Sequence, residues 1–259
     1  MRALRTVRVT RYVTPLREGG SLPAIVEADD DGMYVLKFRG AGQGARALVA
    51  ELVSGEIARS LGLPVPEIVF AELDPDLART EPDPEIHALI HDSGGLNLAI
   101  DYLPGSVMFD AIVDRPDAEL ASRIVWFDAC VTNVDRTARN PNLLMWHRRL
   151  WLIDHGATLY FHHAPGWEHD ADRASRPFAM IREHLLVRHA TRLKDVDEAM
   201  AAALTSDTID GIVNMIPDGW LRGDGATAEP AQYRAAYGRY LRERLRAPRA
   251  FVEEAAGVR

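Results

Sequence analysis

Short apolar runs, the first of them alternating with polar positions, dominate the first hundred residues, and this pattern is typical of β-strands. The runs predict strands over residues 5–13, 24–28, 33–39, 65–72 and 96–103. Residues 45–61 instead repeat their apolar positions at helical spacing, and Gly62 follows as a helix stop. The acidic, proline-rich stretch at residues 73–85 predicts a loop.

Beyond residue 104 the apolar positions recur mainly with the period of a helix. This spacing predicts helices over residues 118–132, 178–190, 196–204, 206–215 and 232–246. A polar loop at residues 133–140 and two short strands, at 142–146 and 150–153, interrupt the helical part. The order predicts an α+β chain: a β-rich lobe over residues 1–103, a connector near residue 103, and a mainly helical lobe over 104–259. Ligands often bind in a cleft between two such lobes.

Composition narrows the class of protein. The chain of 259 residues has a net charge of −8, so its bulk electrostatics do not favour a nucleic-acid or anionic-membrane partner. No run approaches the roughly 18 apolar residues of a membrane span. Cys130 is the only cysteine, which excludes an intramolecular disulfide and a multi-cysteine zinc site. We therefore expect a cytoplasmic protein.

The distribution of lysine singles out one position. All but two of the 30 basic residues are arginine, the exceptions being Lys37 and Lys194. A chain with this bias is expected to keep lysine where the compact ammonium group is specifically useful. Lys194 lies in a charged, surface-like stretch, whereas Lys37 lies in the apolar, strand-like run at residues 34–38. This placement indicates a function for Lys37.

Two acidic motifs in the second half have the spacing of phosphotransferase sites. Asp135 precedes Asn140 by five residues in a polar loop, and kinase catalytic loops use this separation for a substrate-orienting aspartate and a magnesium-binding asparagine. Asp154 ends an apolar strand and is followed by His155 and Gly156. A carboxylate there suits magnesium, and the glycine permits a sharp turn. The intervening strand–turn–strand predicts that the two motifs meet.

Glu51, on the predicted helix at residues 45–61, is the expected ion-pair partner of Lys37, because such a pair holds the α- and β-phosphates of ATP in kinases. Glu56 is a rival, but Gly55 and Ala58 lie on the Glu51 side and leave room for a strand. Each signal alone also has a structural interpretation, since aspartate and asparagine cap turns. Their joint order favours phosphoryl transfer.

Residues 127–140 resemble the catalytic segment of the HipA-like kinases, in the order Phe-Asp-x4-Asn-x-Asp-Arg-x3-Asn. Glu51, with the apolar and proline-containing exit at residues 57–66, resembles the glutamate helix of the same family. Residues 152–156 are similar to the metal-binding strand end of phosphoinositide lipid kinases. The resemblance spans residues 19–160 and implies a two-lobed, protein-kinase-like fold, with a nucleotide-binding first lobe and a catalytic second lobe.

The resemblance also implies an activity and a set of site residues. It implies a phosphotransferase that uses ATP and Mg²⁺ and moves the γ-phosphoryl group to a hydroxyl of a protein serine or threonine, or of a small molecule. Asp135, Lys37 and Glu51 would be catalytic, and Asn140 and Asp154 would bind the metal. The nucleotide would contact Lys37, a glycine turn over the phosphates and the connector between the lobes, which are Gly19, Gly20, Ser21, Ile100, Asp101, Tyr102 and Leu103.

Two departures from the family pattern leave alternatives open. Thr137 stands where the family has a histidine, and Asp154 is followed by His155 where protein kinases have phenylalanine. Thr137 and the unusual glycine turn favour a nucleotide-binding pseudokinase. The presence of all four polar motif residues favours an active phosphotransferase; these are Lys37, Asp135, Asn140 and Asp154. Four histidines lie close together in the sequence: His155, His162, His163 and His169. A zinc site or metal hydrolase built on them would lack cysteine ligands, and the sequence has no H-E-x-x-H helix.

Overall fold

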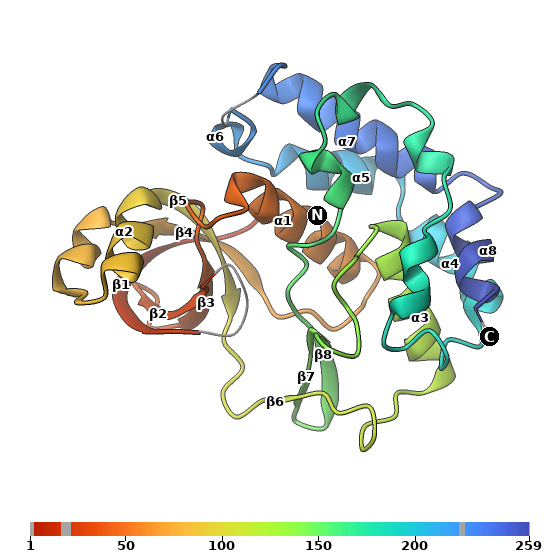
Figure 1. Cartoon of the computed structure of the whole chain (residues 1–259), viewed down its shortest axis with the longest axis horizontal. Helices are drawn as coiled ribbons and strands as arrows, with labels where there is room; N and C mark the ends of the chain where they lie inside the picture. The colour runs from red at the N-terminus through yellow and green to blue at the C-terminus, as the bar shows by residue number, and fades with distance from the viewer. Residues whose placement is uncertain (1–2, 17–21, 223–225, 259) are drawn as a thin grey trace.

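The structure is a computed structural model that describes residues 3–16, 22–222 and 226–258. Its first part is a closed β-barrel with the strand order β1-β2-β3-β5-β4 (left in Figure 1). The parallel β1–β4 pair closes it, and the other pairs are antiparallel. The five strands are β1 (Thr6–Pro15), β2 (Ala24–Ala28), β3 (Met33–Lys37), β4 (Ile68–Leu73) and β5 (Gly95–Asp101).

The helix α1 (Gly44–Ser60) connects the barrel to the rest of the molecule (Figure 1). It is buried on nearly every side, and its apolar residues belong to the larger of two hydrophobic cores. That core also contains residues of the helical part, such as Ile124 and Trp126, whereas the barrel interior forms a core of its own. The helix that carries Glu51 is therefore held from both sides.

In the helical part, the helix α3 (Ala118–Cys130) is mostly buried. The thiol of Cys130 lies inside, and burial raises its pKa to about 12, so it stays protonated at neutral pH. A small antiparallel sheet has the order β6-β7-β8. The remaining elements are β6 (Val107–Met108), β7 (Leu143–Trp146), β8 (Arg149–Leu152), α4 (Leu193–Ala203), α5 (Ser206–Asn214), α6 (Asp218–Leu221), α7 (Pro230–Arg244) and α8 (Ala250–Ala256).

The α+β prediction is confirmed, but two segments differ from expectation. The predicted loop at residues 73–85 contains the 3₁₀ turn Pro75–Thr80 and the first residues of α2 (Pro84–Asp92). Proline is compatible with the first helical position, and the preceding Asp74 and Asp83 each accept a backbone N–H bond as N-caps. The prolines therefore start helical turns in this segment.

The predicted helix at residues 178–190 is wrong. The segment forms a 3₁₀ turn over Ala179–Glu183 and then a series of turns. The backbone N–H of Leu185 bonds to the carbonyl oxygen of Arg136, and that of Leu186 bonds to the ring of His184. These bonds replace those of a continuous helix.

Among the described helices, none combines the length and the apolar composition that a membrane span requires.

Gly55 is required where α1 meets the barrel. A Cβ atom at this position would lie 2.3 Å from Cδ1 of Ile68 on β4. We expect Gly55→Ala to lower the free energy of unfolding by about 1–3 kcal/mol through overpacking, although alanine has the higher helix propensity. Urea unfolding of the purified variant measures this change.

Gly219→Ala is the matched control, because Gly219 is also helical and a Cβ atom added there would have no atom within 4 Å. This control is expected to be neutral or slightly stabilising. Ile68→Val removes the atom that the new methyl group would meet, so adding it to Gly55→Ala is expected to cost less than adding it to the parent. A Gly55→Ala protein as stable as the parent would contradict the contact.

Candidate active site

Lys37, Glu51 and Asp154 meet where β3, α1 and the end of β8 approach one another. Nζ of Lys37 lies 3.0 Å from Oε2 of Glu51 and also contacts Oδ1 of Asp154. The expected Lys37–Glu51 ion pair is thus present, and Glu56 bonds to Arg59 instead, at 2.6 Å. The group is well shielded, with the Lys37 side chain 11% exposed and that of Glu51 fully buried.

Burial disfavours the charged forms of Lys37 and Glu51, but the attraction between the two charges outweighs this effect. Desolvation alone would lower the pKa of Lys37, yet Glu51 and Asp154 hold that pKa above its ordinary value. Desolvation would likewise raise the pKa of Glu51, and the charge of Lys37 and hydrogen bonds from His155 hold it well below its usual range. Lys37 and Glu51 are therefore both ionised at neutral pH.

His155 is the second partner of Glu51, and the sequence analysis assigned it no such contact. Its backbone N–H donates to Oε2 of Glu51 at 2.8 Å, and its Nδ1 lies 3.3 Å from Oε1. The imidazole is fully buried and packs edge-on against Phe127. The turn that follows β8 is thereby tied to α1, although 104 residues separate the two bonded groups.

The sharp turn after β8 has its unusual backbone conformation at Asp154 and not at the glycine. Asp154 has a φ of +54°, in the left-handed region, whereas Gly156 does not adopt a positive φ. Such a conformation in a residue other than glycine is uncommon and needs support from its surroundings. The contacts of Lys37 with Asp154, and of Glu51 with His155, provide that support.

The loop that follows α3 places Asp135 against two asparagines. Oδ2 of Asp135 accepts hydrogen bonds from Nδ2 of Asn140, at 2.7 Å, and from Nδ2 of Asn142, at 3.2 Å. Since the amide nitrogen of Asn140 donates to Asp135, the amide oxygen of Asn140 is not used in this contact. Asp135 is half-buried, and its bonds to these side chains use one carboxylate oxygen. The other oxygen accepts no hydrogen bond from the described residues.

A buried carboxylate, Asp128, organises this loop from beneath. It accepts hydrogen bonds from Nδ2 of Asn133 at 2.7 Å, from Nε of Arg136 at 2.7 Å and from Nε2 of His184 at 2.8 Å. Desolvation opposes its charge, but Arg136 and His184 hold the pKa of Asp128 well below its ordinary value. The guanidinium of Arg136 also bonds to the carbonyl oxygen of Asn142. Asp128 therefore holds the start of the loop directly through Asn133, and its end indirectly through Arg136 and Asn142.

His184 is a part of the site that sequence analysis missed. It lies beside Thr137, with which it forms an isolated β-bridge, and its ring reaches the carboxylate below the loop. Thr137 occupies the position of the histidine in the family pattern, and His184 reaches the same loop from a distant segment. No local pattern marks His184, because its segment carries the periodicity of a helix that does not form.

Asn140 and Asp154 are the candidate metal ligands, and their chemistry suits a hard cation. Asn140 offers its amide oxygen as a metal ligand. Asp154 offers a carboxylate oxygen, since it bonds to Lys37 through Oδ1 only and its side chain is 42% exposed. Oxygen donors of this kind fit Mg²⁺. Across the ranges that the structure describes, no three histidine, cysteine, aspartate or glutamate side chains are grouped to hold a metal ion.

The clustered histidines have other partners. Nδ1 of His162 lies 2.9 Å from the hydroxyl of Tyr237, and its Nε2 lies 3.2 Å from that of His163. Burial holds the pKa of His162 well below its ordinary value, so this ring is neutral at pH 7. His169 is exposed and approaches Glu168 at 3.8 Å. Of the clustered histidines, only His155 contacts the Lys37–Glu51 pair, whereas His162, His163 and His169 form packing and surface contacts.

The predicted nucleotide-contacting residues fall into two groups. Ile100 and Asp101 end β5, and Tyr102 and Leu103 follow; the N–H groups of Asp101 and Tyr102 bond to the carbonyl oxygens of Glu67 and Met33. Leu103 is buried. Their contact with a nucleotide stays a prediction. The predicted phosphate-covering residues lie outside the described ranges: Gly19, Gly20 and Ser21.

The site can now be compared with known proteins. A family model described as HipA-like kinase matches residues 9–248. None of the curated proteins matches the chain. The crystal structure of the Helicobacter pylori proinflammatory kinase CtkA aligns with a TM-score of 0.56 and 10% identity, covering 98% of this chain and 96% of that one. The Golgi casein kinase with Mn/ADP bound aligns with a TM-score of 0.48 and 12% identity, covering 96% and 75% of the two chains. The likeness to CtkA confirms the kinase-like fold.

The hydrogen bonds of Asp128 with Asn133, Arg136 and His184 are expected to stabilise the fold. Asp128→Asn removes a buried charge and leaves the guanidinium of Arg136 without its anion, which is expected to cost about 3–5 kcal/mol of unfolding free energy. Because the pKa of Asp128 is depressed in the folded protein, its contribution is present above the ordinary carboxyl value of about 3.9 and is lost as the pH falls below it. The parent and variant should therefore converge at low pH in urea titrations.

Asp195→Asn is the control, since Asp195 forms an exposed surface pair with Arg192 at 3.1 Å. This substitution is expected to change stability by less than about 0.5 kcal/mol. An Asp128→Asn protein as stable as this control would show that Asp128 does not hold the loop together.

Proposed function

The chain belongs to the HipA-like kinase family, and from this premise we propose that it transfers the γ-phosphoryl group of ATP to a hydroxyl group, with Mg²⁺ as its metal ion. The observation that carries the proposal is the meeting of Lys37 with both Glu51 and Asp154. A strand lysine, a helix glutamate and a strand-end aspartate in contact are the groups that position ATP phosphates in kinases.

In the proposed complex Lys37 binds the α- and β-phosphates. In the structure its ammonium group contacts both Glu51 and Asp154. Glu51 is also bonded to His155, so it keeps its position when a phosphate oxygen takes the place of Asp154 beside Lys37. Asp154 then has both oxygens available. Asn140 and Asp154 would hold Mg²⁺, which neutralises phosphate charge when bound.

Asp135 is the proposed acceptor-binding residue. Its Oδ2 is held by Asn140 and Asn142, which leaves Oδ1 to accept a hydrogen bond from the substrate hydroxyl. As the hydroxyl oxygen forms its bond to the γ-phosphorus, the bond from that phosphorus to the bridging oxygen of ADP breaks, and the hydroxyl proton passes to Asp135. The proposed acceptor is a protein serine or threonine or a small-molecule alcohol.

The test is incubation with γ-labelled ATP and magnesium, followed by intact-mass analysis of the protein and of candidate acceptors. We expect one or more phosphate additions with the parent chain. Asp135→Ala should lower turnover about 10²–10⁴-fold, because it removes the group that receives the proton. The same variant should keep its affinity for Mg-ATP within a few-fold, since Asp135 faces the acceptor.

Thermal denaturation separates binding from chemistry. Saturating Mg-ATP should raise the Tm of the parent and of Asp135→Ala alike, through mass-action stabilisation. Asp154→Ala should lose the part of the shift that depends on magnesium. A parent chain with no shift in Mg-ATP contradicts the proposal, and a shift without phosphate transfer to any acceptor favours a nucleotide-binding pseudokinase.

The two lysines provide a matched pair of substitutions. Lys37→Arg should reduce kcat/KM about 100-fold or more, because the planar guanidinium cannot replace the compact ammonium between a carboxylate and a phosphate. Lys194→Arg should be silent, since Lys194 forms an exposed pair with Glu253 at 3.0 Å. Steady-state kinetics of the two variants measures the contrast, and equal activities would rule out the role of Lys37 on phosphate.

A further inference from the structure

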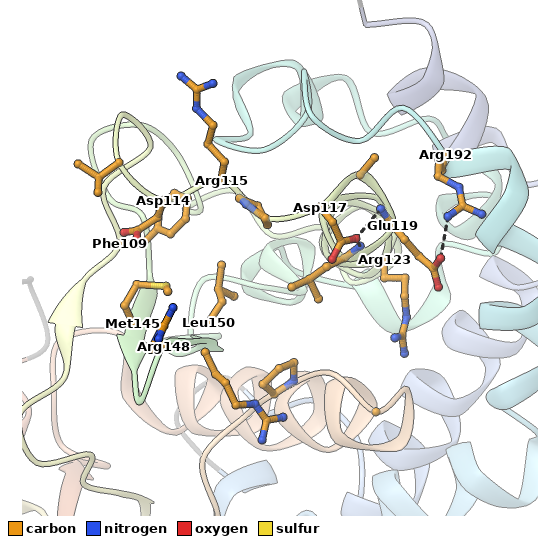
Figure 2. Close-up of a pocket in the computed structure, with 17 residues that line it drawn as sticks. Phe109, Asp114, Arg115, Asp117, Glu119, Arg123, Met145, Arg148, Leu150 and Arg192 are labelled. Atoms are coloured by element: carbon orange, nitrogen blue, oxygen red, sulfur yellow. Dashed lines mark hydrogen bonds and ion pairs between the residues drawn. The ribbon is translucent and has the colours of Figure 1, made fainter.

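A groove of about 920 Å³ lies outside the proposed active site, between the β7–β8 turn, the start of α3 and the segment after β6 (Figure 2). None of the proposed catalytic or metal-binding residues lines it. Five arginines do, two of them neighbours in the β7–β8 turn, and we call this region the arginine groove: Arg115, Arg123, Arg148, Arg149 and Arg192. Figure 2 shows Arg115, Arg123, Arg148 and Arg192 among the residues that line this pocket, with Arg115 extending away from the other three and Arg192 turned to Glu119.

The acidic residues of the groove are already bonded within the protein. Asp117 caps α3 by accepting two backbone N–H bonds, at 2.9 and 2.8 Å. Asp114 accepts from the N–H of Asp110 at 3.0 Å, and Glu119 pairs with Arg192 at 2.7 Å. Among the arginines that line the groove in the described chain, only Arg192 is neutralised in this way. The groove is therefore locally positive in a chain whose net charge is −8.

The other four guanidinium groups have no carboxylate partner among the described residues. Arg123 donates to the carbonyl oxygen of Leu61, and Arg149 lies over the ring of Trp151 at 5.7 Å. Within residues 3–16, 22–222 and 226–258, neither Arg115 nor Arg148 forms a hydrogen bond or an ion pair through its side chain. Arginine readily forms paired hydrogen bonds to carboxylates, so these groups are suited to bind an external acidic group.

Apolar side chains accompany the positive charge. Val107 and Met108 form β6, an edge strand that pairs only with β7 within the described sheet, and both are exposed. Ile112 and Val113, just beyond them, are 83% and 76% exposed. These four account for half of the exposed large hydrophobic residues in the described chain, so the apolar surface is concentrated at this site. Such a concentration marks a surface for protein binding.

We propose that the arginine groove, together with the adjoining exposed residues Val107, Met108, Ile112 and Val113, binds a segment of a partner protein. This segment carries both acidic and aliphatic side chains. Carboxylates of the segment pair with Arg115 and Arg148, and its aliphatic groups cover Ile112 and Val113. A small anion would leave those exposed aliphatic residues uncovered. The guanidinium groups also come from several separate segments around an open groove, which suits an extended chain.

The test uses the full chain and a fluorescein-labelled peptide of about 12 residues that mixes glutamate with leucine, long enough to span such a site. Fluorescence anisotropy should show binding that weakens as salt is raised, because the contacts are electrostatic and exposed. Replacing each glutamate by glutamine should abolish it. Arg115→Gln combined with Arg148→Gln should weaken binding about tenfold or more, and Ile112→Ser with Val113→Ser should also weaken it.

Arg79→Gln combined with Arg246→Gln is the matched control, because these arginines are exposed elsewhere and each pairs with a neighbour three residues away. This control should bind like the parent, and both arginine pairs should leave the Tm unchanged. Equal binding of the glutamate and glutamine peptides, or equal weakening by the two arginine pairs, would overturn the proposal.

Two further outcomes would replace the proposed occupant by another. A Tm increase in tripolyphosphate that depends on Arg115 and Arg148, without peptide binding, would assign the groove to a small anion. Self-association in analytical ultracentrifugation that depends on the same arginines, without peptide binding, would assign it to a second copy of the chain. Because none of these measurements depends on phosphoryl transfer, their failure is distinguishable from failure of the proposed function.

Discussion

The buried carboxylate of Glu51 is the interaction on which the arrangement of this protein depends. An ionised carboxylate out of contact with water is very costly unless it is paired and hydrogen-bonded. Here Lys37 and the backbone of His155 satisfy the same oxygen of Glu51, from a barrel strand and from the turn after β8. These two elements and α1 cannot move apart without leaving that charge unpaired. The requirement brings the proposed phosphate-binding and metal-binding groups to one place.

A second buried anion applies the same principle on the helical side. Asp128 holds the loop of Asp135 through Arg136, and it draws in His184 from a segment 56 residues away. The two anions fix different things: Glu51 joins the barrel to the end of β8, and Asp128 shapes the loop that faces the acceptor. The groups that would touch substrate, such as Asp135 and Asp154, are more exposed and are supported from beneath. Preorganised groups on a buried framework are what positioning catalysis requires.

The arginine groove shows the opposite use of charge. Around Glu51 and Asp128 each charge is matched inside the protein, whereas Arg115 and Arg148 have no match among the described residues. Exposed arginines cost little to leave unpaired, because water solvates them. The contrast separates the proposed active site, whose charges are paired within the protein, from a surface whose charge is not paired among the described residues.

The sequence by itself determined the elements whose signals are local. Apolar period and composition predicted the strands of the barrel, α1, α3 and α7, because burial on one face repeats with the geometry of the element. Spacing also marked Asp135, Asn140 and Asp154, the rarity of lysine marked Lys37, and Glu51 was expected as its partner because a small-residue face of its helix leaves room for a strand. Gly55 faces Ile68, which lies on β4 and not on β3, the strand of Lys37. The catalytic roles of these residues stay predictions.

Only the tertiary structure decided which distant groups complete the site. His155 bonds to Glu51, and His184 bonds to Asp128, although neither contact has a spacing that a sequence pattern records. The segment of His184 has helical periodicity, but its backbone bonds to the loop of Arg136 and the helix does not form. The arginine groove likewise arises from segments that meet only after folding. Local patterns report which face of an element is buried, whereas partners across the fold depend on how the elements pack.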